Sequence, residues 1–569
     1  MRRFEQRLSS ELERRLIFFC LIDNVTSDYV EVFKNEFTYR HFLEEGREEE
    51  FDKKFDEAIE FVNKEVLGKR FPLYIGGKEV FASQEIQEYS PIDKRLIGRF
   101  QKGSREEARV AVDEAYEAFE SWKEVNYKDR VGIFRKAAEI FSRDKFKIAA
   151  IMSIENGKTR YESVGEVDEA IDFLNYYAIE VERNKGFVRT ARISGSSAKV
   201  SAGFQGAPGN EEKVSIRMRP YGVFGVIAPF NFPVSISTGM SSGALLTGNT
   251  VVLKPSSTDN MAMLTGLKIY EIFKEAGLPD GVFNYVTGPG SEVGEEILMN
   301  KKVAGIAFTG SRSTGMGMIS RSFSAGMQKI FVVEMGGKNP VIVSKYADLD
   351  IAVAGIASAA FGYSGQKCSA ASRVYVNESI KEEFVSKLLD KMRTFKIGDP
   401  INKENYIGPL ISEKAFSRYK ESIEEGKNSG RVIFGGNSVD FGNGCFYVEP
   451  TLIEIEHKNR LFHEELFLPI LVIDTYKKFD EALHNANDSE YGLTAGLYSN
   501  KKGEIKEFLD KIEAGVVYVN REISATTGAI VGFHTFVGWK GSGLTGKGTG
   551  SRFYLQQFMR EQSQAEVRG

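Results

Sequence analysis

The sequence predicts an α/β fold in which doubly wound parallel sheets are covered by helices. A first unit alternates strands with helices and contains strand 223–228, helix 237–246, strand 250–254, helix 261–276, strand 282–286 and strand 305–308. A second alternating unit follows, from Glu334 to about Val519. Strands separated by helices form parallel sheets, which bind ligands at the carboxyl ends of their strands. Because 569 residues exceed one compact core, we expect two large domains.

The segments before this alternation are expected to be largely helical. The first 70 residues are highly charged and carry apolar residues at helical spacing, namely Phe51, Phe55, Ile59, Val62 and Val66. After a strand at 73–75, helical patterns cover 105–122, 129–144 and 166–183. A stretch rich in Gly, Ser and Ala, 186–210, interrupts the domain.

The C-terminal part changes composition again. A Gly/Ser-rich stretch over 538–550 precedes an apolar segment, Phe553 to Phe558. We expect this apolar segment to add a strand to the sheet of a partner subunit.

Composition excludes several classes of protein. The formal net charge of −4 and the lack of a basic patch with interleaved aromatic residues argue against nucleic-acid binding. The longest apolar run near the N-terminus, 16–22, is too short to span a bilayer, so we expect no membrane association. Three distant cysteines, Cys20, Cys368 and Cys445, argue against a disulfide framework and favour a reducing, cytoplasmic location.

Metal binding is not expected from the histidine pattern. The five histidines, among them His41, His463, His484 and His534, form no paired motif with ligand spacing. Each is interpreted as a surface or core histidine.

Three motifs carry candidate chemistry. Cys368 lies in FGYSGQKCSA (361–370), where small neighbours admit a substrate and a nearby cation or helix N-terminus would lower the thiol pKa. The alternative is a small core cysteine. Glu334 ends the strand in VVEMGGKNP (332–340) as a candidate base or as an ion-pair partner of Lys338. Asn231, in GVIAPFNFP (225–233), is a candidate amide donor or a helix cap.

Together and in this order, the three motifs resemble the aldehyde dehydrogenase superfamily. Similar segments extend from about Phe71 to about Phe553 and include VVLKPS (251–256), FTGS (308–311) and EELF (464–467). Within the superfamily, GQKCSA (365–370) and TGAIVG (527–532) followed by Phe536 are most similar to the glutamate-semialdehyde branch.

The resemblance implies a domain organisation. It comprises a helical N-terminal extension (1–70), a discontinuous NAD-binding domain (71–185 and 212–333), a catalytic domain (334–544) and oligomerisation segments (186–211 and 545–569). A homo-oligomer, a dimer or larger, is therefore expected. The first thirty residues match nothing in the family and their role stays open.

The resemblance also implies a cofactor site for NAD. Its expected residues are Lys254 at the adenine ribose, Gly310 and Ser311 at the pyrophosphate, and Glu465 and Phe467 at the nicotinamide ribose and ring. A helix N-terminus following Ser311 would be a physically sensible anion site. Many NAD-preferring relatives place a glutamate at the position of Ser257, so repulsion of a 2′-phosphate is missing and NADP use stays open.

For catalysis, the resemblance implies attack by the Cys368 thiolate on an aldehyde, hydride transfer to NAD, and hydrolysis of the thioester by water that Glu334 activates. Asn231 and the Cys368 N–H would stabilise the oxyanion. The amino-acid end of glutamate semialdehyde would be held by Phe232, Ser369, Gly528, Ala529 and Phe536. Leu468 and Val537 replace glycines usual in the family, which puts the local loop shape in doubt.

Two alternatives stay open at this point. The same chemistry could act on another semialdehyde or aldehyde, such as a longer amino-acid homologue. A catalytically silent family member with a binding or structural role is the second, because a fold alone does not guarantee activity.

Overall fold

A computed structural model describes residues 33–194, 211–259, 261–522 and 530–568. The chain divides into two units, 1–34 and 35–569, and every element below belongs to the second. Cys20 and the expectations for the first thirty residues lie outside the described part.

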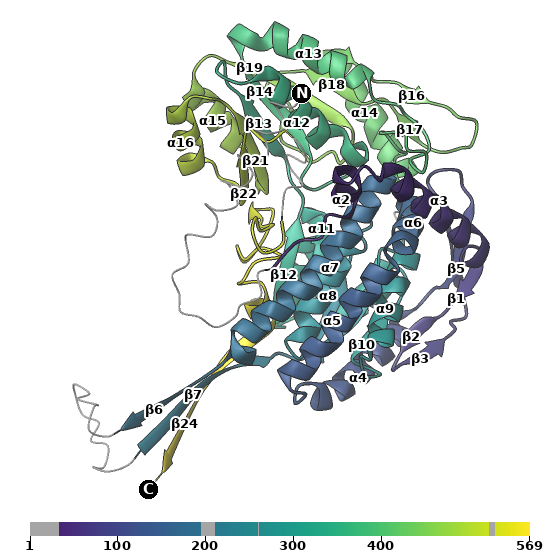
Figure 1. Cartoon of the computed structure of the whole chain (residues 1–569), viewed down its shortest axis with the longest axis vertical. Helices are drawn as coiled ribbons and strands as arrows, with labels where there is room; N and C mark the ends of the chain where they lie inside the picture. The colour runs from purple at the N-terminus through teal and green to yellow at the C-terminus, as the bar shows by residue number, and fades with distance from the viewer. Residues whose placement is uncertain (1–32, 195–210, 260, 523–529, 569) are drawn as a thin grey trace. The chain divides into compact units, whose positions relative to one another are not determined.

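The first large sheet has seven strands and is parallel except at one edge (Figure 1). In spatial order the strands are β12 (Ile330–Met335), β11 (Val303–Gly310), β8 (Val223–Ile227), β9 (Thr250–Lys254), β10 (Phe283–Tyr285), β2 (Leu73–Ile75) and β3 (Lys78–Val80). The first five run parallel, while β2 and β3 add an antiparallel hairpin. β8 and β9 are almost wholly buried, as expected of parallel strands covered on both faces.

Helices cover both faces of this sheet. One face packs on α4 (Arg105–Trp122), α10 (Glu295–Met299) and α11 (Arg312–Ser324) through a core that includes Val112, Val252 and Ile306. The other face is covered by α8 (Ser235–Leu246) and α9 (Met263–Ala276), behind which lie α5 (Tyr127–Arg143), α6 (Lys145–Asn156) and α7 (Arg160–Arg183). α7 begins six residues before the predicted 166, because Thr159 caps an extra turn by accepting the N–H of Glu162.

The second large sheet also has seven strands. In spatial order they are β15 (Arg431–Phe434), β18 (Thr451–Glu454), β19 (Ile470–Tyr476), β14 (Ala371–Asn377), β13 (Asn339–Val343), β21 (Thr494–Tyr498) and β22 (Val516–Val519). Only the edge pair β15–β18 is antiparallel. The prediction of two parallel, helix-covered sheets is therefore confirmed.

Alternate residues of this sheet enter two separate cores. Ile342 and Tyr375 pack with α14 (Glu413–Ser429) and α15 (Phe479–Asn487) on one face. Val341 and Val374 pack with α12 (Leu349–Phe361) and α13 (Lys381–Arg393) on the other. The period of two along each strand thus divides the apolar side chains between the faces.

Helices α2 (Thr38–Glu44) and α3 (Glu48–Glu65) form the predicted N-terminal helical segment. Phe51, Phe55 and Val62 of α3 are buried, as their spacing predicted. Ion pairs and hydrogen bonds add to this packing: the Arg160 guanidinium contacts Asp52 at 2.8 Å, and the N–H of Thr38 donates to Asp168 at 2.8 Å.

A three-stranded antiparallel sheet is built from distant parts of the chain (Figure 1). β7 (Glu211–Pro220) lies between β6 (Val188–Ser194) and β24 (Met559–Arg568). The strand expected at 553–558 is wrong: residues Leu555–Phe558 form a short 3-10 turn, and β24 follows it. Tyr554, Leu555 and Phe558 of this segment are instead buried, with the Phe558 ring 5.1 Å from that of Phe224, whereas Phe553 is exposed.

The remaining described elements are short or peripheral. They are β1 (Lys69–Phe71), β4 (Glu85–Tyr89), β5 (Leu96–Gln101), β16 (Ser438–Val439), β17 (Tyr447–Val448), β20 (Tyr491–Gly492), β23 (Trp539–Lys540) and α16 (Lys502–Lys511). Among the described residues, no helix combines the length and apolar character needed to cross a membrane.

Candidate active site

Several candidate residues follow neighbouring strands of the first sheet. Asn231 comes after β8, Lys254 ends β9, Gly310 ends β11, and Glu334 is the penultimate residue of β12. Because β12, β11, β8 and β9 are adjacent and parallel, their carboxyl ends form one edge of the sheet. This edge is where parallel α/β sheets bind their ligands.

Two features of this edge suit an anionic, ribose-containing ligand. The Lys254 ammonium is buried and donates to the carbonyl of Pro255 at 3.2 Å, and burial lowers its pKa to about 8. Ser311 caps α11 by accepting the N–H of Thr314 at 3.3 Å, so the amino end of this helix adjoins the same edge. A helix N-terminus and a buried cation fit a dinucleotide.

Ser257, the residue expected to influence the choice between NAD and NADP, is not exposed to solvent. Its side chain is buried, and its hydroxyl donates to the Pro255 carbonyl at 2.9 Å. The same carbonyl therefore accepts from both Lys254 and Ser257, which links the two positions.

Cys368 lies in a strained loop that precedes β14. Tyr363, Ser364 and Gly365 have φ angles of 50°, 52° and 67°, a left-handed run that is unfavourable for the two non-glycine residues. At Gly365 a Cβ atom would lie 2.2 Å from the carbonyl of Leu468, so only glycine fits. The Asn339 amide holds the loop by donating to the Cys368 carbonyl at 2.7 Å.

Direct contacts join the two sheets at this point. The Asn231 amide donates to the carbonyl of Gln366 at 3.2 Å, which brings it to the loop that carries Cys368. The Gly337 N–H donates to the Glu465 carboxylate at 2.8 Å, and a Cβ at Gly336 would lie 2.3 Å from that carboxylate. The glycine turn after Glu334 thus lets Glu465 approach closely.

Glu465 and Phe467 lie in the segment before β19, next to the glycine turn and Phe230 respectively. Burial raises the pKa of Glu465 to about 7, although the Gly337 N–H and the Lys338 charge lower it. Phe467 has a φ of 60°, and its ring meets that of Phe230 edge-on at 6.0 Å. This ring pair connects the segment before β19 with the one after β8.

The electrostatics of Cys368 differ from the expectation. Removal from water raises the pKa of its thiol, and the charges of Glu465 and Glu334 raise it further. The neighbouring cation does not offset this, because the Lys367 ammonium is paired with Glu162 at 2.8 Å. The expectation of a depressed pKa is therefore wrong for this thiol.

Glu334 has the properties of a base that works near neutral pH. Burial raises its pKa to about 7, while the Thr549 hydroxyl, which donates to Oε1 at 2.9 Å, lowers it. No ion pair joins Glu334 to Lys338 within the described part of the chain, so the structural alternative for this carboxylate is not realised. A carboxylate with such a pKa can accept a proton from water.

The candidate substrate residues are placed only in part. The Phe232 ring lies under the Lys158 ammonium at 3.6 Å, and Ser369 is buried next to Cys368. Phe536 is near Glu334, because its N–H donates to the carbonyl of Thr549 at 3.2 Å. Gly528 and Ala529 lie outside the described residues.

Sequence reasoning missed three residues at this site. Thr549 contacts Glu334 from 215 positions away, and no local pattern marks it. Lys158 and Glu166 form a buried ion pair beside Phe232, and Glu166 also accepts the N–H groups of Val234 and Ser235 at the start of α8. Lys158 lies before α7 and Glu166 within it, and no local pattern indicates that the pair packs against Phe232.

Comparisons with known proteins agree with this geometry. The model of the aldehyde dehydrogenase family matches residues 80–563. The 1-pyrroline-5-carboxylate dehydrogenase 1 of Halalkalibacterium halodurans is 38% identical over 522 residues, which cover 90% of this chain and 96% of that protein. A solved 1-pyrroline-5-carboxylate dehydrogenase from Thermus with bound NAD is 33% identical with a TM-score of 0.82, covering 96% of this chain and 99% of the other. A further solved structure, proline utilization A from Bdellovibrio bacteriovorus, is 32% identical with a TM-score of 0.85 and covers 95% of this chain, which spans 54% of that larger protein. From its motifs, its two sheets and these similarities, the chain belongs to the aldehyde dehydrogenase family.

Proposed function

We propose that this protein oxidises L-glutamate γ-semialdehyde, the open form of 1-pyrroline-5-carboxylate, to L-glutamate with NAD, as a step of proline degradation. The relatives that bear the name 1-pyrroline-5-carboxylate dehydrogenase support the substrate. One structural observation carries the chemistry: the Asn231 amide donates to the carbonyl of Gln366 at 3.2 Å, which brings the proposed oxyanion donor to the loop that carries Cys368.

The covalent step belongs to Cys368. Its sulfur attacks the aldehyde carbon, the thiol proton passes to solvent water, and the carbonyl oxygen becomes an oxyanion in a thiohemiacetal. The Asn231 amide, which lies at the Cys368 loop, and the Cys368 N–H are the proposed donors to that oxyanion. Loss of one such donor costs about a hundredfold to a thousandfold in rate.

Bound NAD would supply the hydride acceptor, so that the thiohemiacetal becomes a thioester. Lys254 and Ser257 would hold the adenine ribose, Gly310 and Ser311 the pyrophosphate, and Glu465 and Phe467 the nicotinamide ribose and ring. The buried Lys254 ammonium and the position of the amino end of α11 at the same edge of the sheet support this assignment. Ser257 offers no negative charge against a 2′-phosphate, so NADP is proposed as a weaker alternative.

Hydrolysis of the thioester belongs to Glu334. The carboxylate accepts a proton from water, the resulting hydroxide attacks the thioester carbon, and the Cys368 sulfur leaves as the acid forms. Because the pKa of Glu334 is about 7, a large share of the carboxylate is ionised at neutral pH. An unperturbed carboxylate would be ionised too, but it would be a weaker base.

Substrate selection is proposed to rest on polar groups around an apolar stem. Phe232 and Phe536 would pack along the methylene groups, and Ser369 with Gly528 and Ala529 would hold the carboxylate. Phe232 is backed by the buried Lys158–Glu166 pair, which fixes its ring position. Each hydrogen bond to a charged group contributes about 1.5–3 kcal/mol.

We also propose a homo-oligomer in the cytoplasm. The three-stranded sheet β24-β7-β6 has two outer strands without a further partner among the described residues, and unpaired strand edges favour association. The reducing location rests on the widely spaced cysteines of the sequence.

A substrate and cofactor panel on the purified protein tests the proposal. Glutamate semialdehyde should exceed propanal and hexanal in kcat/KM by about a hundredfold or more, the value of two or three such hydrogen bonds after the cost of ordering the ligand. Equal efficiency on all three aldehydes would leave only a general aldehyde dehydrogenase. Complete inactivity with either cofactor would favour the catalytically silent alternative.

A further inference from the structure

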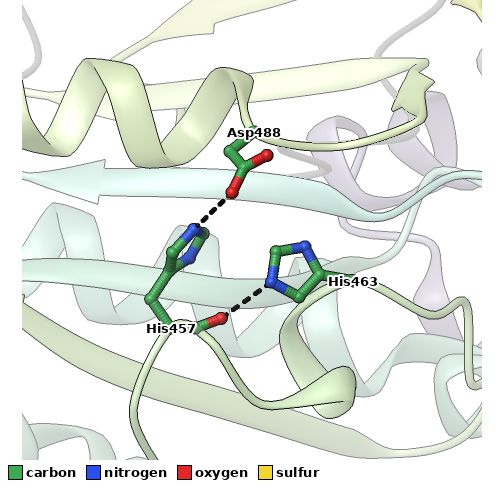
Figure 2. A group of neighbouring side chains, drawn as sticks. All are labelled: His457, His463 and Asp488. Atoms are coloured by element: carbon green, nitrogen blue, oxygen red, sulfur yellow. Dashed lines mark hydrogen bonds and ion pairs between the residues drawn. The ribbon is translucent and has the colours of Figure 1, made fainter.

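Two histidines and an aspartate that the proposed reaction does not use lie close together (Figure 2). His457 lies in the loop after β18, His463 follows the short 3-10 turn Arg460–Phe462, and Asp488 follows α15. One potential ligand atom from each residue lies within 4.8 Å of the other two. The closest pair is Nε2 of His457 and Oδ2 of Asp488, which are 2.9 Å apart.

The outer nitrogen of each imidazole is held by the protein. Nδ1 of His457 lies 2.8 Å from the Tyr375 hydroxyl, and Nε2 of His463 lies 2.9 Å from the His457 carbonyl. A carbonyl only accepts, so His463 donates through Nε2–H and keeps a lone pair on Nδ1. Histidines that bind metals show this arrangement, in which one nitrogen is anchored by the protein and the other coordinates.

The Tyr375 hydroxyl is itself fixed, which orients His457 further. It accepts from the Arg373 guanidinium at 3.1 Å, and it donates to the Asn485 carbonyl at 3.1 Å. A carboxylate only accepts, so Nε2–H of His457 donates to Asp488 at 2.9 Å in this structure. A bound ion would replace this proton on Nε2, while Nδ1–H donates to the Tyr375 hydroxyl.

The charge state of the three groups suits a cation. Burial lowers the pKa of His457, and the positive charge of Arg373 acts in the same direction. The hydrogen bond from His457 lowers the pKa of Asp488, so its carboxylate is ionised. Two neutral imidazoles and one carboxylate are a common ligand set for zinc and related divalent ions.

We propose that His457, His463 and Asp488 bind one divalent transition-metal ion of the zinc class, with a fourth position left for water. Tetrahedral coordination at about 2.0–2.2 Å places ligand atoms about 3.3–3.6 Å apart, so the 2.9 Å pair must open slightly and any pair near the 4.8 Å limit must close. The Asp488 side chain can supply this movement, because it is 56% exposed. Of the two histidines, only His457 is hydrogen-bonded to it.

Such an ion would link separate segments around the second large sheet. Asp488 closes α15, whereas His457 and His463 bracket the 3-10 turn that leads to Glu465 two residues later. The bound ion would therefore fix the segment that carries Glu465 and Phe467. Without a metal, the same contacts would form only a hydrogen-bond network. The experiment must therefore distinguish a metal site from such a network.

The experiment is a Zn²⁺ titration of the full chain, prepared without a histidine tag, by calorimetry and thermal unfolding. A Cys368→Ala background removes the active-site thiol as a competing zinc ligand. We expect one equivalent to bind and to raise Tm. His463→Gln and Asp488→Asn should each weaken binding at least about tenfold and abolish the rise in Tm.

His484→Gln is the matched control. His484 is exposed and lies on α15 one turn before Asp488, but it is not one of the three proposed ligands. Its loss should therefore leave both the Zn²⁺ affinity and the rise in Tm unchanged. Acidification to about pH 5.5 should weaken binding in the parent, because protons compete for the imidazoles.

Two results would overturn the inference. One is the absence of saturable Zn²⁺ binding in the Cys368→Ala protein. The other is a Zn²⁺ affinity that is the same in His463→Gln and Asp488→Asn as in the parent, when both variants also have the Tm of the parent without zinc. Asp488→Asn changes an exposed side chain, so a folding failure is not expected to obscure the comparison.

Discussion

Removing the hydroxyl of Thr549 should shift the pH dependence of the proposed enzyme without removing any group that reacts. In Thr549→Val the side chain keeps its shape, and the backbone hydrogen bond to Glu334 is retained. The carboxylate loses the hydroxyl that donates to it at 2.9 Å. Since that bond stabilises the ionised form, the pKa of Glu334 should rise above its present value of about 7.

The size of the shift follows from the strength of the bond. A hydrogen bond to a charged group contributes about 1.5–3 kcal/mol, and one pKa unit corresponds to about 1.4 kcal/mol, so the pKa rises by about one to two units. At pH 7 the ionised share of Glu334 then falls from about one half to between about a tenth and a hundredth. The step that Glu334 serves should slow by about 5-fold to 50-fold at that pH.

The assay measures kcat between pH 6 and 10 by NADH absorbance, together with the pre-steady-state burst. The acidic limb of the profile should move upward by one to two units, and kcat should recover at high pH. The NADH burst at pH 7 should persist, because hydride transfer precedes the use of Glu334 as a base. Thr549→Ser keeps the hydroxyl and should retain the parent profile.

An acidic limb that does not move would show that Glu334 is not the titrating base or that Thr549 does not tune it. A loss of kcat that stays constant from pH 6 to 10 would indicate a general distortion of the site. In either case the electrostatic argument is refuted, whereas the family assignment is unaffected.

Three further changes test the remaining assignments. Cys368→Ala should abolish dehydrogenase activity and keep NAD binding, which calorimetry measures. Cys445→Ala should have activity near that of the wild type. Equal losses of activity in both variants would instead indicate structural roles for both thiols. Glu334→Gln should slow thioester hydrolysis by about a hundredfold to ten-thousandfold and leave a rapid NADH burst, whereas a missing burst would move its role to an earlier step. Ser257→Glu should lower kcat/KM for NADP more than for NAD through repulsion of the 2′-phosphate, and an unchanged ratio would show that this position does not face the ribose.

Part of the fold was predictable because its cause is local. The periods of apolar residues marked α4 almost to the residue, and apolar segments marked the buried strands β8 and β9 of the first sheet. The segment 553–558 failed for a related reason: its apolar character signals burial, but not whether a strand or a turn is buried. The true strand, β24, is polar and gives no alternating pattern, because its side chains are largely exposed.

The sequence by itself determined the three reactive candidates, since Cys368, Glu334 and Asn231 each sit in a recognisable motif. Only the tertiary structure decided their environments. Thr549 reaches Glu334 across 215 positions, Lys367 turns to Glu162 instead of activating its neighbour Cys368, and His463 meets Asp488. A pKa or a ligand set depends on burial and on charges within a few ångströms, and packing brings these together from segments with no common local pattern.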